Sequence, residues 1–323
     1  MDANGRRGAA LRRLGWLGLA AILISSSGAT CMPWAKWKTD ERIPIAFQHT
    51  PTMGEVIQKV NQNTASIRQL QADAVRIAAP GAPSLKATLA LERPRNLRIR
   101  GELLMSRELD IGSNDTAFWI WGKNATGALL HANHDAFAMS PTSESLPIDP
   151  DWLLDALGLA SFDPNAQHSG PYAHGPGSME IHSQFVNARG EPLVKVTVVH
   201  SVYGWILEQQ VRDRRNRVIA AAKASNHRHY PEAGATLPDL VEIQIAPGSP
   251  AAIDLRIDVG GYRINELAPT PDLFAIPAFD DYPHINLADP RAYDQWRGLT
   301  GNGTPTAARD EAFQPEYRGY TRK

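Results

Sequence analysis

Apolar and polar residues alternate with a period of two in six segments of this chain of 323 residues. Side chains of a β-strand point alternately to opposite faces, so this pattern gives each strand one dry face and one wet face. In the fourth segment the valines are expected on the dry face and Lys195 and Thr197 on the wet face. Together the segments predict a large antiparallel sheet. They are residues 85–92, 97–100, 118–120, 194–198, 241–245 and 253–259.

Two helices are expected beside these strands. Thr52 can cap a helix, and Glu55 completes a capping box before a run of apolar residues at helical spacing. Asp149 and Pro150 mark the start of a second, short helix, which ends at Gly158. A sheet with a dry face must close on itself or be covered, so these helices are the expected lids.

The first 30 residues have the order of a secretory signal peptide. A basic start is followed by an apolar run at residues 14–24 and a small-residue stretch before Cys31, the only cysteine. Acylation of Cys31 explains why an exported chain carries one unpaired thiol. The position three residues before it holds Gly28, where leucine is usual in a lipoprotein signal. An ordinary signal peptidase site near Ala29 is therefore the alternative.

This interpretation divides the chain into four parts. We predict a lipoprotein signal peptide at residues 1–30, an acylated cysteine and tether at residues 31–50, one domain at residues 51–288 and a flexible tail at residues 289–323. Met32 is not the aspartate that retains some lipoproteins in the inner membrane. The expected location is therefore the outer membrane, with the domain facing the periplasm and held by lipid at Cys31.

Short motifs follow one another in a recognisable order. The opening helix ends in residues 63–67, and residues 89–98 read as a strand, a proline turn and an arginine-bearing strand. Residues 113–119 form a turn into an aromatic strand. Residues 207–213 precede a hairpin, and residues 272–277 form a closing phenylalanine-proline segment. This order resembles the LolA/LolB-like superfamily of lipoprotein carriers and receptors.

The resemblance covers roughly residues 50–280 and implies both a fold and a function. The fold is α+β and mainly β: a curved antiparallel sheet, or half-open β-barrel, lidded by helices over a hydrophobic cavity. The implied function is binding of acyl chains, of lipoproteins or of free lipids, without covalent chemistry. A membrane-tethered member is more similar to the receptor than to the soluble carrier.

Two groups of residues are candidates for ligand binding. Apolar residues of the strands are candidates to line the cavity, the alternative being that they fill a closed core. Four arginines are candidates to bind anionic groups, the alternative being a solvated outer face of the sheet. The cavity candidates are Leu89, Leu91, Leu97, Ile99, Phe118, Ile120, Val196, Val198, Ile243 and Leu255. The arginines are Arg93, Arg95, Arg98 and Arg100.

Residues that could carry catalysis or bind a metal do not form a convincing pattern. His131 and His134 lie close together, and His227 and His229 form a His-x-His pair, but neither pair has a third ligand at diagnostic spacing. Residues 226–231 read as a polar loop after a strand. The chain has neither a Gly-x-Ser-x-Gly elbow nor a glycine-rich phosphate loop. We therefore expect no metal, no cofactor and no enzymatic activity.

Two hypotheses of function remain. The first is an envelope lipoprotein that binds lipid or lipoprotein acyl chains as a carrier or receptor. The second is a non-catalytic envelope sensor or scaffold that uses the same fold and a protein partner. The formal net charge of −1 gives no electrostatic reason to expect nucleic acid as a partner.

Overall fold

The computed structural model describes residues 43–145, 150–249, 252–292 and 294–296. The chain divides into two compact units, Met1–Arg42 and Ile43–Lys323, and the second contains all of these residues. The predicted signal peptide and Cys31 lie outside the described residues, as do residues 297–323 of the predicted tail. No helix in the described ranges is long and apolar enough to cross a membrane.

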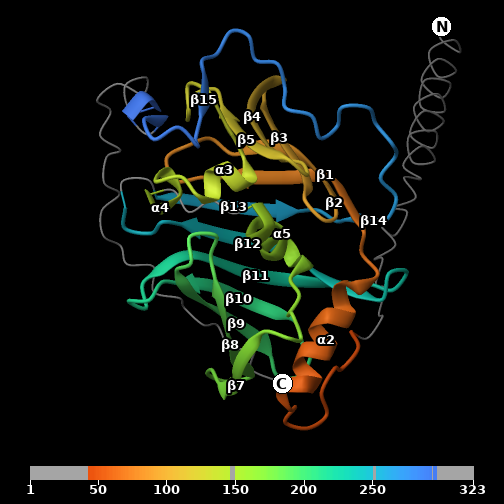
Figure 1. Ribbon diagram of the computed structural model, residues 1–323. Helices are drawn as coiled ribbons and strands as arrows, with labels where there is room; N and C mark the ends of the chain where they lie inside the picture. The colour runs from red at the N-terminus through yellow and green to blue at the C-terminus, as the bar shows by residue number, and fades with distance from the viewer. Residues whose placement is uncertain (1–42, 146–149, 250–251, 293, 297–323) are drawn as a thin grey trace, which may run out of the picture. The chain divides into compact units, whose positions relative to one another are not determined.

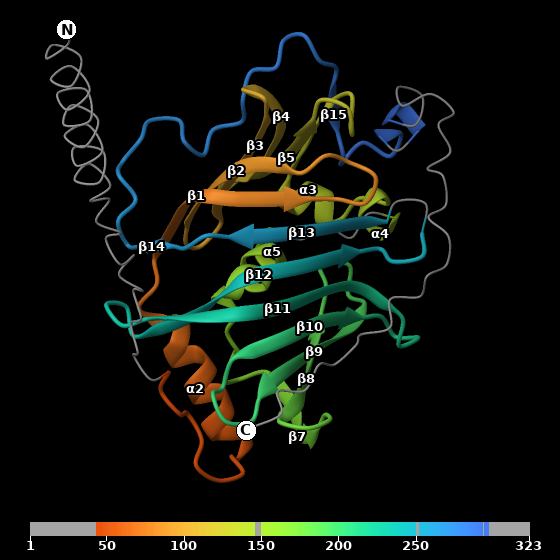
Figure 2. The same cartoon turned by 180° about the vertical axis from the view of Figure 1, so that it is seen from behind.

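Fifteen strands of the described residues form one curved sheet (Figures 1 and 2). The first half of the chain supplies β1 (Gln69–Ala78), β2 (Leu85–Glu92), β3 (Asn96–Leu103), β4 (Ser106–Ser113), β5 (Ala117–Gly122) and β6 (Leu129–Asn133). The second half supplies β7 (Gln167–Ala173), β8 (Ser178–Val186), β9 (Pro192–His200), β10 (Ile206–Arg212), β11 (Val218–Tyr230), β12 (Ala235–Ile245) and β13 (Ile253–Val259). Two short strands follow, β14 (Arg263–Ile264) and β15 (His284–Asn286).

The sheet consists of two antiparallel meanders that meet in its middle. Its order is β15-β6-β5-β4-β3-β2-β1-β13-β12-β11-β10-β9-β8-β7, with β14 beside β1. The meanders join where β1 pairs with β13, and Val75 lies opposite Val259. The short strand β15 adds to β6 in parallel. Because β6 and β7 lie near opposite ends of this order, the chain between them must cross one face of the sheet.

Five helical elements lie in the described residues before β7. They are α2 (Met53–Ala65), α3 (His134–Ala138), α4 (Thr142–Ser145), α5 (Pro150–Leu154) and the π-helical turn η1 (Asp155–Leu159). The last four belong to the segment that crosses from β6 to β7. Figure 1 shows α3, α4 and α5 in front of the sheet, and Figure 2 shows the strands from behind. The helix-bearing face is the concave face, and the other is the convex face.

Helix α2 has the capping box that the sequence predicts. The Thr52 side chain accepts a hydrogen bond from the backbone N–H of Glu55, and the Glu55 carboxylate accepts one from the Thr52 backbone N–H. On the opposite side of the helix Val56 and Val60 are buried and pack in a cluster that includes Ile181 of β8. This helix therefore covers the concave face at the β8–β9 end.

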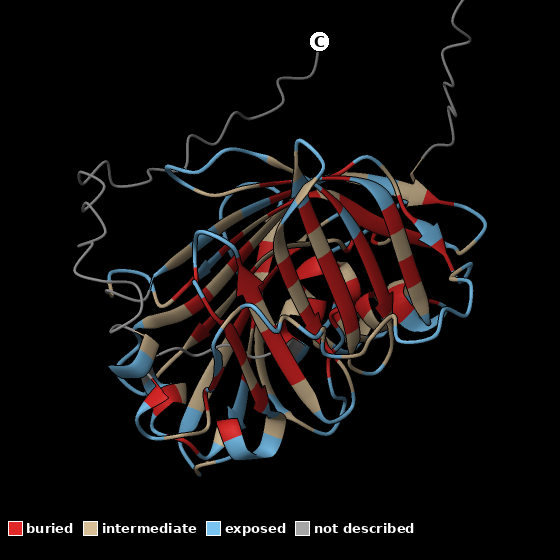
Figure 3. Ribbon diagram, turned by 90° about the horizontal axis from the view of Figure 1, so that it is seen from above, coloured by how far each residue is buried: buried red, intermediate tan, exposed pale blue. Residues whose placement is uncertain are grey.

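The concave face can be followed across the sheet by strand register. Thr197 lies opposite Gln209 and Gln209 opposite Ala222. The same row continues through Ile243 of β12 to Leu255 of β13. Most concave side chains of the central strands belong to one buried cluster that also contains side chains of α5 and η1. Figure 3 shows buried residues both on the strands and on the helices that they enclose.

A segment after β14 covers part of the convex face. This strap, residues 266–283, passes over β3–β5, where Arg98 and Asp110 form an ion pair of 2.7 Å with exposures of 4% and 0%. Trp119 Nε1 donates to the second oxygen of the Asp110 carboxylate at 3.0 Å. Arg98 Nη1 also donates to the carbonyl oxygen of Ala275 in the strap at 2.7 Å. The strap therefore seals a charged pair inside the protein.

The sequence prediction for β9 is wrong about which residues face the concave side. Register places Lys195 and Thr197 on the concave face and Val196 and Val198 on the convex face. Val196, Thr197 and Val198 are all buried, so the alternation of apolar and polar residues does not indicate which face of β9 is exposed to water. The polar residues face inward because Lys195 has a carboxylate partner there, Asp155 of η1.

Two further predictions concern loops and helix ends. The polar loop predicted at residues 226–231 is wrong, because β11 continues to Tyr230 and pairs His227 and His229 with β12. The short helix before Gly158 is confirmed, and Gly158 has a φ of 101° that ends the helical geometry. Asp149, its predicted cap, lies outside the described residues.

Candidate functional site: the concave face and its lid

The centre of the concave face is covered by α5 and η1, residues 150–159, which we call the lid. Its inner side carries four large apolar side chains, Trp152, Leu154, Leu157 and Leu159, none more than 6% exposed. They belong to the main core cluster together with concave side chains of the strands. The turn η1 packs on β11 and β12. The lid therefore occupies the apolar surface that the sheet offers.

Three polar contacts hold the inner end of the lid. The Asp155 carboxylate lies 2.5 Å from Lys195 Nζ, and its backbone oxygen accepts from Gln209 Nε2 at 3.0 Å. Arg93 Nη2 donates to the carbonyl oxygen of Leu159 at 2.8 Å. Burial lowers the pKa of Arg93, and the charge of Asp155 offsets this in part. Charged groups from both halves of the sheet thus hold the lid.

Contacts near the two ends of the lid are also polar. At its start Arg95 and Asp151 form an ion pair of 2.9 Å with exposures of 39% and 49%. Just after its end Asn61 of α2 makes two hydrogen bonds of 2.8 Å with the backbone of Phe162. The hydrogen bonds between Asn61 and Phe162 join neutral groups. The Arg95–Asp151 ion pair is open to water and contributes little to stability.

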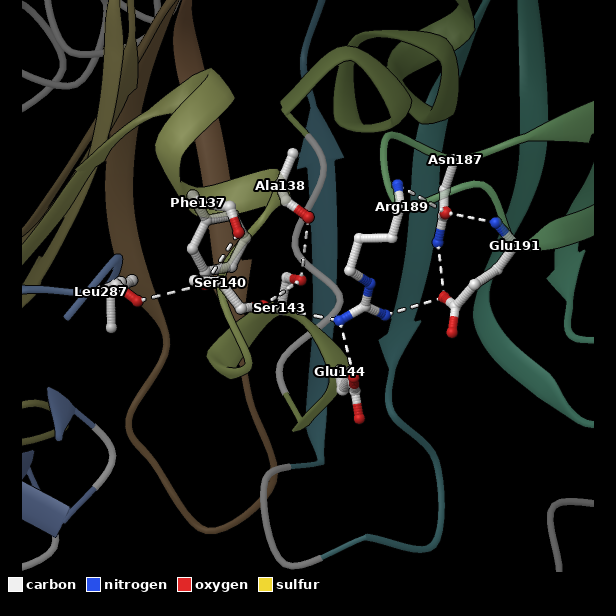
Figure 4. A network of polar contacts seen from close by, with 9 residues as sticks. All are labelled: Phe137, Ala138, Ser140, Ser143, Glu144, Asn187, Arg189, Glu191 and Leu287. Atoms are coloured by element: carbon white, nitrogen blue, oxygen red, sulfur yellow. Dashed lines mark hydrogen bonds and ion pairs between the residues drawn. The ribbon is translucent and has the colours of Figure 1, made fainter. Parts of the chain in front are cut away.

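The segment before the lid is fixed by Arg189 (Figure 4). Its guanidinium lies 2.9 Å from Glu144 of α4 and 2.8 Å from Glu191 at the start of the β9 side of the hairpin. Asn187 orients the same turn by accepting from the Arg189 backbone N–H at 3.0 Å. Because α4 follows β6 and the β8–β9 hairpin lies near the other end of the sheet, Arg189 links opposite ends across the concave face.

Several polar atoms beneath the lid have no hydrogen-bond partner among the described residues. Thr197 Oγ1 and Gln209 Oε1 are buried on the concave face, and Trp152 Nε1 is buried in the lid. An unsatisfied polar atom in a protein interior costs about 1–3 kcal/mol. The concave face is therefore polar at its β9–β10 end in a way that core packing does not require.

A small cavity lies between α2, η1 and the strands β10–β12. Its volume is about 20 Å³, and Gln209 and His227 are among the residues that line it. That volume suits about one water molecule. His227 Nε2 donates to the carbonyl oxygen of Ile206 at 3.0 Å, and burial lowers its pKa to about 4. His227 is therefore neutral at pH 7.

The predicted cavity residues are only partly brought together. Five of them, Leu89, Leu91, Leu97, Ile99 and Ile243, lie in the main cluster with the lid, and Leu255 packs against it. Phe118 and Ile120 lie on the same face but pack in a separate cluster with Phe137 of α3. Val196 and Val198 lie on the convex face. As the structure stands, these side chains and the lid fill the space between them.

The four predicted arginines divide into two pairs. Arg93 and Arg95 contact the lid, through Leu159 and Asp151 respectively. Arg98 and Arg100 lie on the convex face of β3, where Arg98 is buried in its ion pair. Burial lowers the pKa of Arg100, and the charge of Arg98 lowers it further.

The histidines considered as metal ligands serve other contacts. His134 Nε2 lies 2.8 Å from the carbonyl oxygen of Asn114, and His229 Nδ1 lies 3.1 Å from Thr236 Oγ1. Within the described ranges no group of three or more histidine, cysteine, aspartate or glutamate residues is placed to hold a metal ion.

Sequence reasoning missed two features of this site. Lys195 and Gln209 face the lid, although alternation put Lys195 on the wet side. Leu104 and Met105 form the tip of the β3–β4 hairpin and are 94% and 97% exposed. The available signal for this tip was a leucine-methionine pair in a turn, where polar residues are the rule.

Comparisons with known proteins find likeness in structure alone. No family model matches the chain, and no curated protein matches its sequence. A domain described as an outer membrane lipoprotein-sorting protein, from Vibrio parahaemolyticus, aligns over 68% of this chain and 94% of its own, with 10% identity and a TM-score of 0.44. A LolA superfamily protein from Nitrosomonas europaea aligns over 68% and 96%, with 11% identity and a TM-score of 0.42.

A DUF1329 family protein from Desulfovibrio piger aligns over 68% of this chain and 94% of its own, with 10% identity and a TM-score of 0.43. The chain's own architecture, a curved antiparallel sheet with helices on its concave face, is the one that the LolA/LolB-like resemblance implied.

Proposed function

We propose that the protein is a membrane-anchored, non-catalytic envelope lipoprotein that binds the acyl chain of a lipid or lipoprotein on its concave face. The observation that carries the proposal is the lid. A continuous apolar surface of the sheet is covered by ten residues of a crossing segment, and polar contacts at the margins hold that segment. An acyl chain would bind where the inner side chains of the lid now pack.

The energies of this exchange are comparable. Burial of an acyl chain of about 14 methylenes is worth about 11 kcal/mol, at about 0.8 kcal/mol for each. The four large side chains of the lid are worth about 1.5–3 kcal/mol each, or about 6–12 kcal/mol together. A ligand can therefore replace the lid without a large net cost, and the closed state protects the apolar face when no ligand is bound.

One other feature supports a place at a membrane. The exposed tip of Leu104 and Met105 offers two apolar side chains to a bilayer or an incoming lipid. Anchoring through an acylated Cys31 in the outer membrane is part of the same proposal and rests on the sequence of the signal.

Native mass spectrometry of the full chain, purified from bacterial cells, tests the proposal. A stoichiometric lipid adduct, or uptake of an added fluorescent fatty acid, is expected. Leu157→Ser should increase uptake, because Leu157 is fully buried in the lid. Leu153→Ser is the comparison, and it should increase uptake less, because Leu153 is only partly buried where it packs against the same cluster.

A second candidate function is an envelope sensor or scaffold, and the filled concave face favours it. The cavity of about 20 Å³ has no room for an acyl chain while the lid is closed. A clean protein mass that ignores added lipid, in both the wild type and Leu157→Ser, would contradict lipid binding and support this alternative.

A further inference from the structure

The concave face is apolar over most of its width but polar at one end, in front of the lid residue Asp155. Lys195 and Thr197 project from β9, and Gln209 from β10. Lys195 keeps 18% of its side chain exposed, whereas Thr197 and Gln209 are 1% and 2% exposed. This end thus grades from a partly wet ammonium group to buried hydroxyl and amide groups.

The polar end already binds an anion that belongs to the protein itself. The carboxylate of Asp155 bonds to Lys195 Nζ, and Gln209 Nε2 bonds to the backbone oxygen of the same residue. Thr197 Oγ1 and Gln209 Oε1 remain buried and without a partner in the described residues, and Gln209 lines the small cavity beside η1. Of these two atoms the Thr197 hydroxyl can donate, so the site has one hydrogen-bond donor that the lid does not use.

An apolar path leads away from this polar end. The row of Gln209 continues through Ala222, Ile243 and Leu255, and the neighbouring row through Ala220. Four strand spacings of about 4.8 Å separate β9 from β13, which gives a path of about 19 Å across the sheet. The two alanines leave depth on β11, where η1 now packs.

We infer that Asp155 occupies the place of a ligand carboxylate, and that the ligand is a single-chain fatty acid whose head group binds Lys195, Gln209 and Thr197. This inference rests on the proposed function and names its ligand class. When the lid moves away, Lys195 and Gln209 no longer contact Asp155 and can bind the ligand carboxylate. The Thr197 hydroxyl can donate a hydrogen bond to the same carboxylate. The chain then lies across β11–β13 in place of the lid.

A carboxylate fits this end better than a neutral head. One ammonium group matches one negative charge, and a charged hydrogen bond is worth more than a neutral one. Burial lowers the pKa of Arg93, and the charge of Asp155 offsets part of this lowering, which shows that the two groups interact. Arg93 therefore adds positive potential at the same place. A methyl ester of the same chain length would keep the apolar contacts and lose the ionic one.

Binding of palmitate and methyl palmitate to the full chain, measured by displacement of a fluorescent probe below micellar concentrations, tests the inference. The wild type should bind palmitate about tenfold or more tightly than the ester. Lys195→Met should abolish that preference. Asp155→Asn breaks the same ion pair but keeps the ammonium group, so it should tighten palmitate binding and keep the preference.

The two variants separate a head-group site from a simple lid anchor. If the ion pair only anchors the lid, both variants will shift both probes alike, and that outcome overturns the inference. Lys86→Met removes a lysine from the convex face of β2 and should leave the preference unchanged. Binding of both probes with no preference in the wild type refutes the head-group site alone, whereas binding of neither refutes the proposed function as well.

Discussion

The lid on the concave face and the strap on the convex face differ in how their charges are held. The lid's ion pair, Asp155 with Lys195, keeps 28% and 18% of its side chains exposed. The strap seals Arg98 and Asp110 at 4% and 0% exposure. When the lid moves, water can replace the contacts of its ion pair. Opening of the strap would instead expose the Arg98–Asp110 pair, which is buried in the folded protein. We therefore expect the lid to open more readily than the strap.

The largest expected effect is at the strap. Asp110→Asn leaves the guanidinium of Arg98 buried without its counter-charge, and should lower the free energy of unfolding by about 3–5 kcal/mol in urea titrations. The double variant Arg98→Met, Asp110→Asn should recover a large part of that loss. A loss below about 1 kcal/mol in the single variant would contradict the buried character of this pair.

Acid should lower the stability of the fold through His227, which lines the cavity beside the lid. The pKa of His227 is about 4 in the fold against 6.5 for the free side chain, so the unfolded chain binds the proton first as the pH falls. The free energy of unfolding should therefore fall between pH 6.5 and pH 4, by up to about 1.4 kcal/mol per pH unit from this group.

His227→Gln offers a control for this pH dependence, because glutamine keeps an N–H donor but does not titrate. Between pH 4 and pH 6.5 the free energy of unfolding of the variant should change less with pH than that of the wild type. Above pH 7 the two proteins should show the same pH dependence. An equal slope in the wild type and the variant would show that other groups cause the acid sensitivity.

A methyl group added at Gly158, near the end of the lid, should make the lid open more readily. Gly158 has a φ of 101°, and a Cβ there would lie 2.6 Å from Pro238 Cδ. Gly158→Ala should therefore cost about 1–3 kcal/mol. Hydrogen exchange should rise in residues 150–159 and stay unchanged in residues 266–283. Equal increases in both segments would mean that the two covers open together.

The smallest expected effect on stability is at the lid's ion pair. Lys195→Met should lower the free energy of unfolding by less than about 1 kcal/mol, because the pair is partly exposed to water. Urea titration beside Asp110→Asn gives the direct comparison. A loss as large as that of Asp110→Asn would place the lid among the permanent parts of the fold.

Local patterns in the sequence predicted where helices begin and end better than they predicted which distant residues a strand contacts. The capping box of Thr52 and Glu55 and the helix end at Gly158 depend on neighbouring residues alone, and both are confirmed. The face of β9 depends on Asp155, 40 residues before Lys195, and alternation carries no information on such a partner.

The candidate site was harder to predict for the same reason. The apolar residues Leu89 to Ile99 are buried as expected, but the polar end of the concave face exists only because β9 and β10 meet the lid. The strap was not visible either, since residues 266–283 have no regular period and Arg98 finds its cover 175 residues away. The expected roles of the cavity residues and of the arginines remain predictions.

The junction of β1 with β13 has a consequence for how this chain folds. Val75 and Val259 become neighbours although most of the domain separates them in the chain. Pairings of such long range slow folding, because the loop must close before any contact forms. During synthesis β1 is complete long before β13 exists, so its free edge is open to pairing with other chains until the last third of the sheet arrives. Aggregation of truncated chains that end before β13 is the expected sign of this delay.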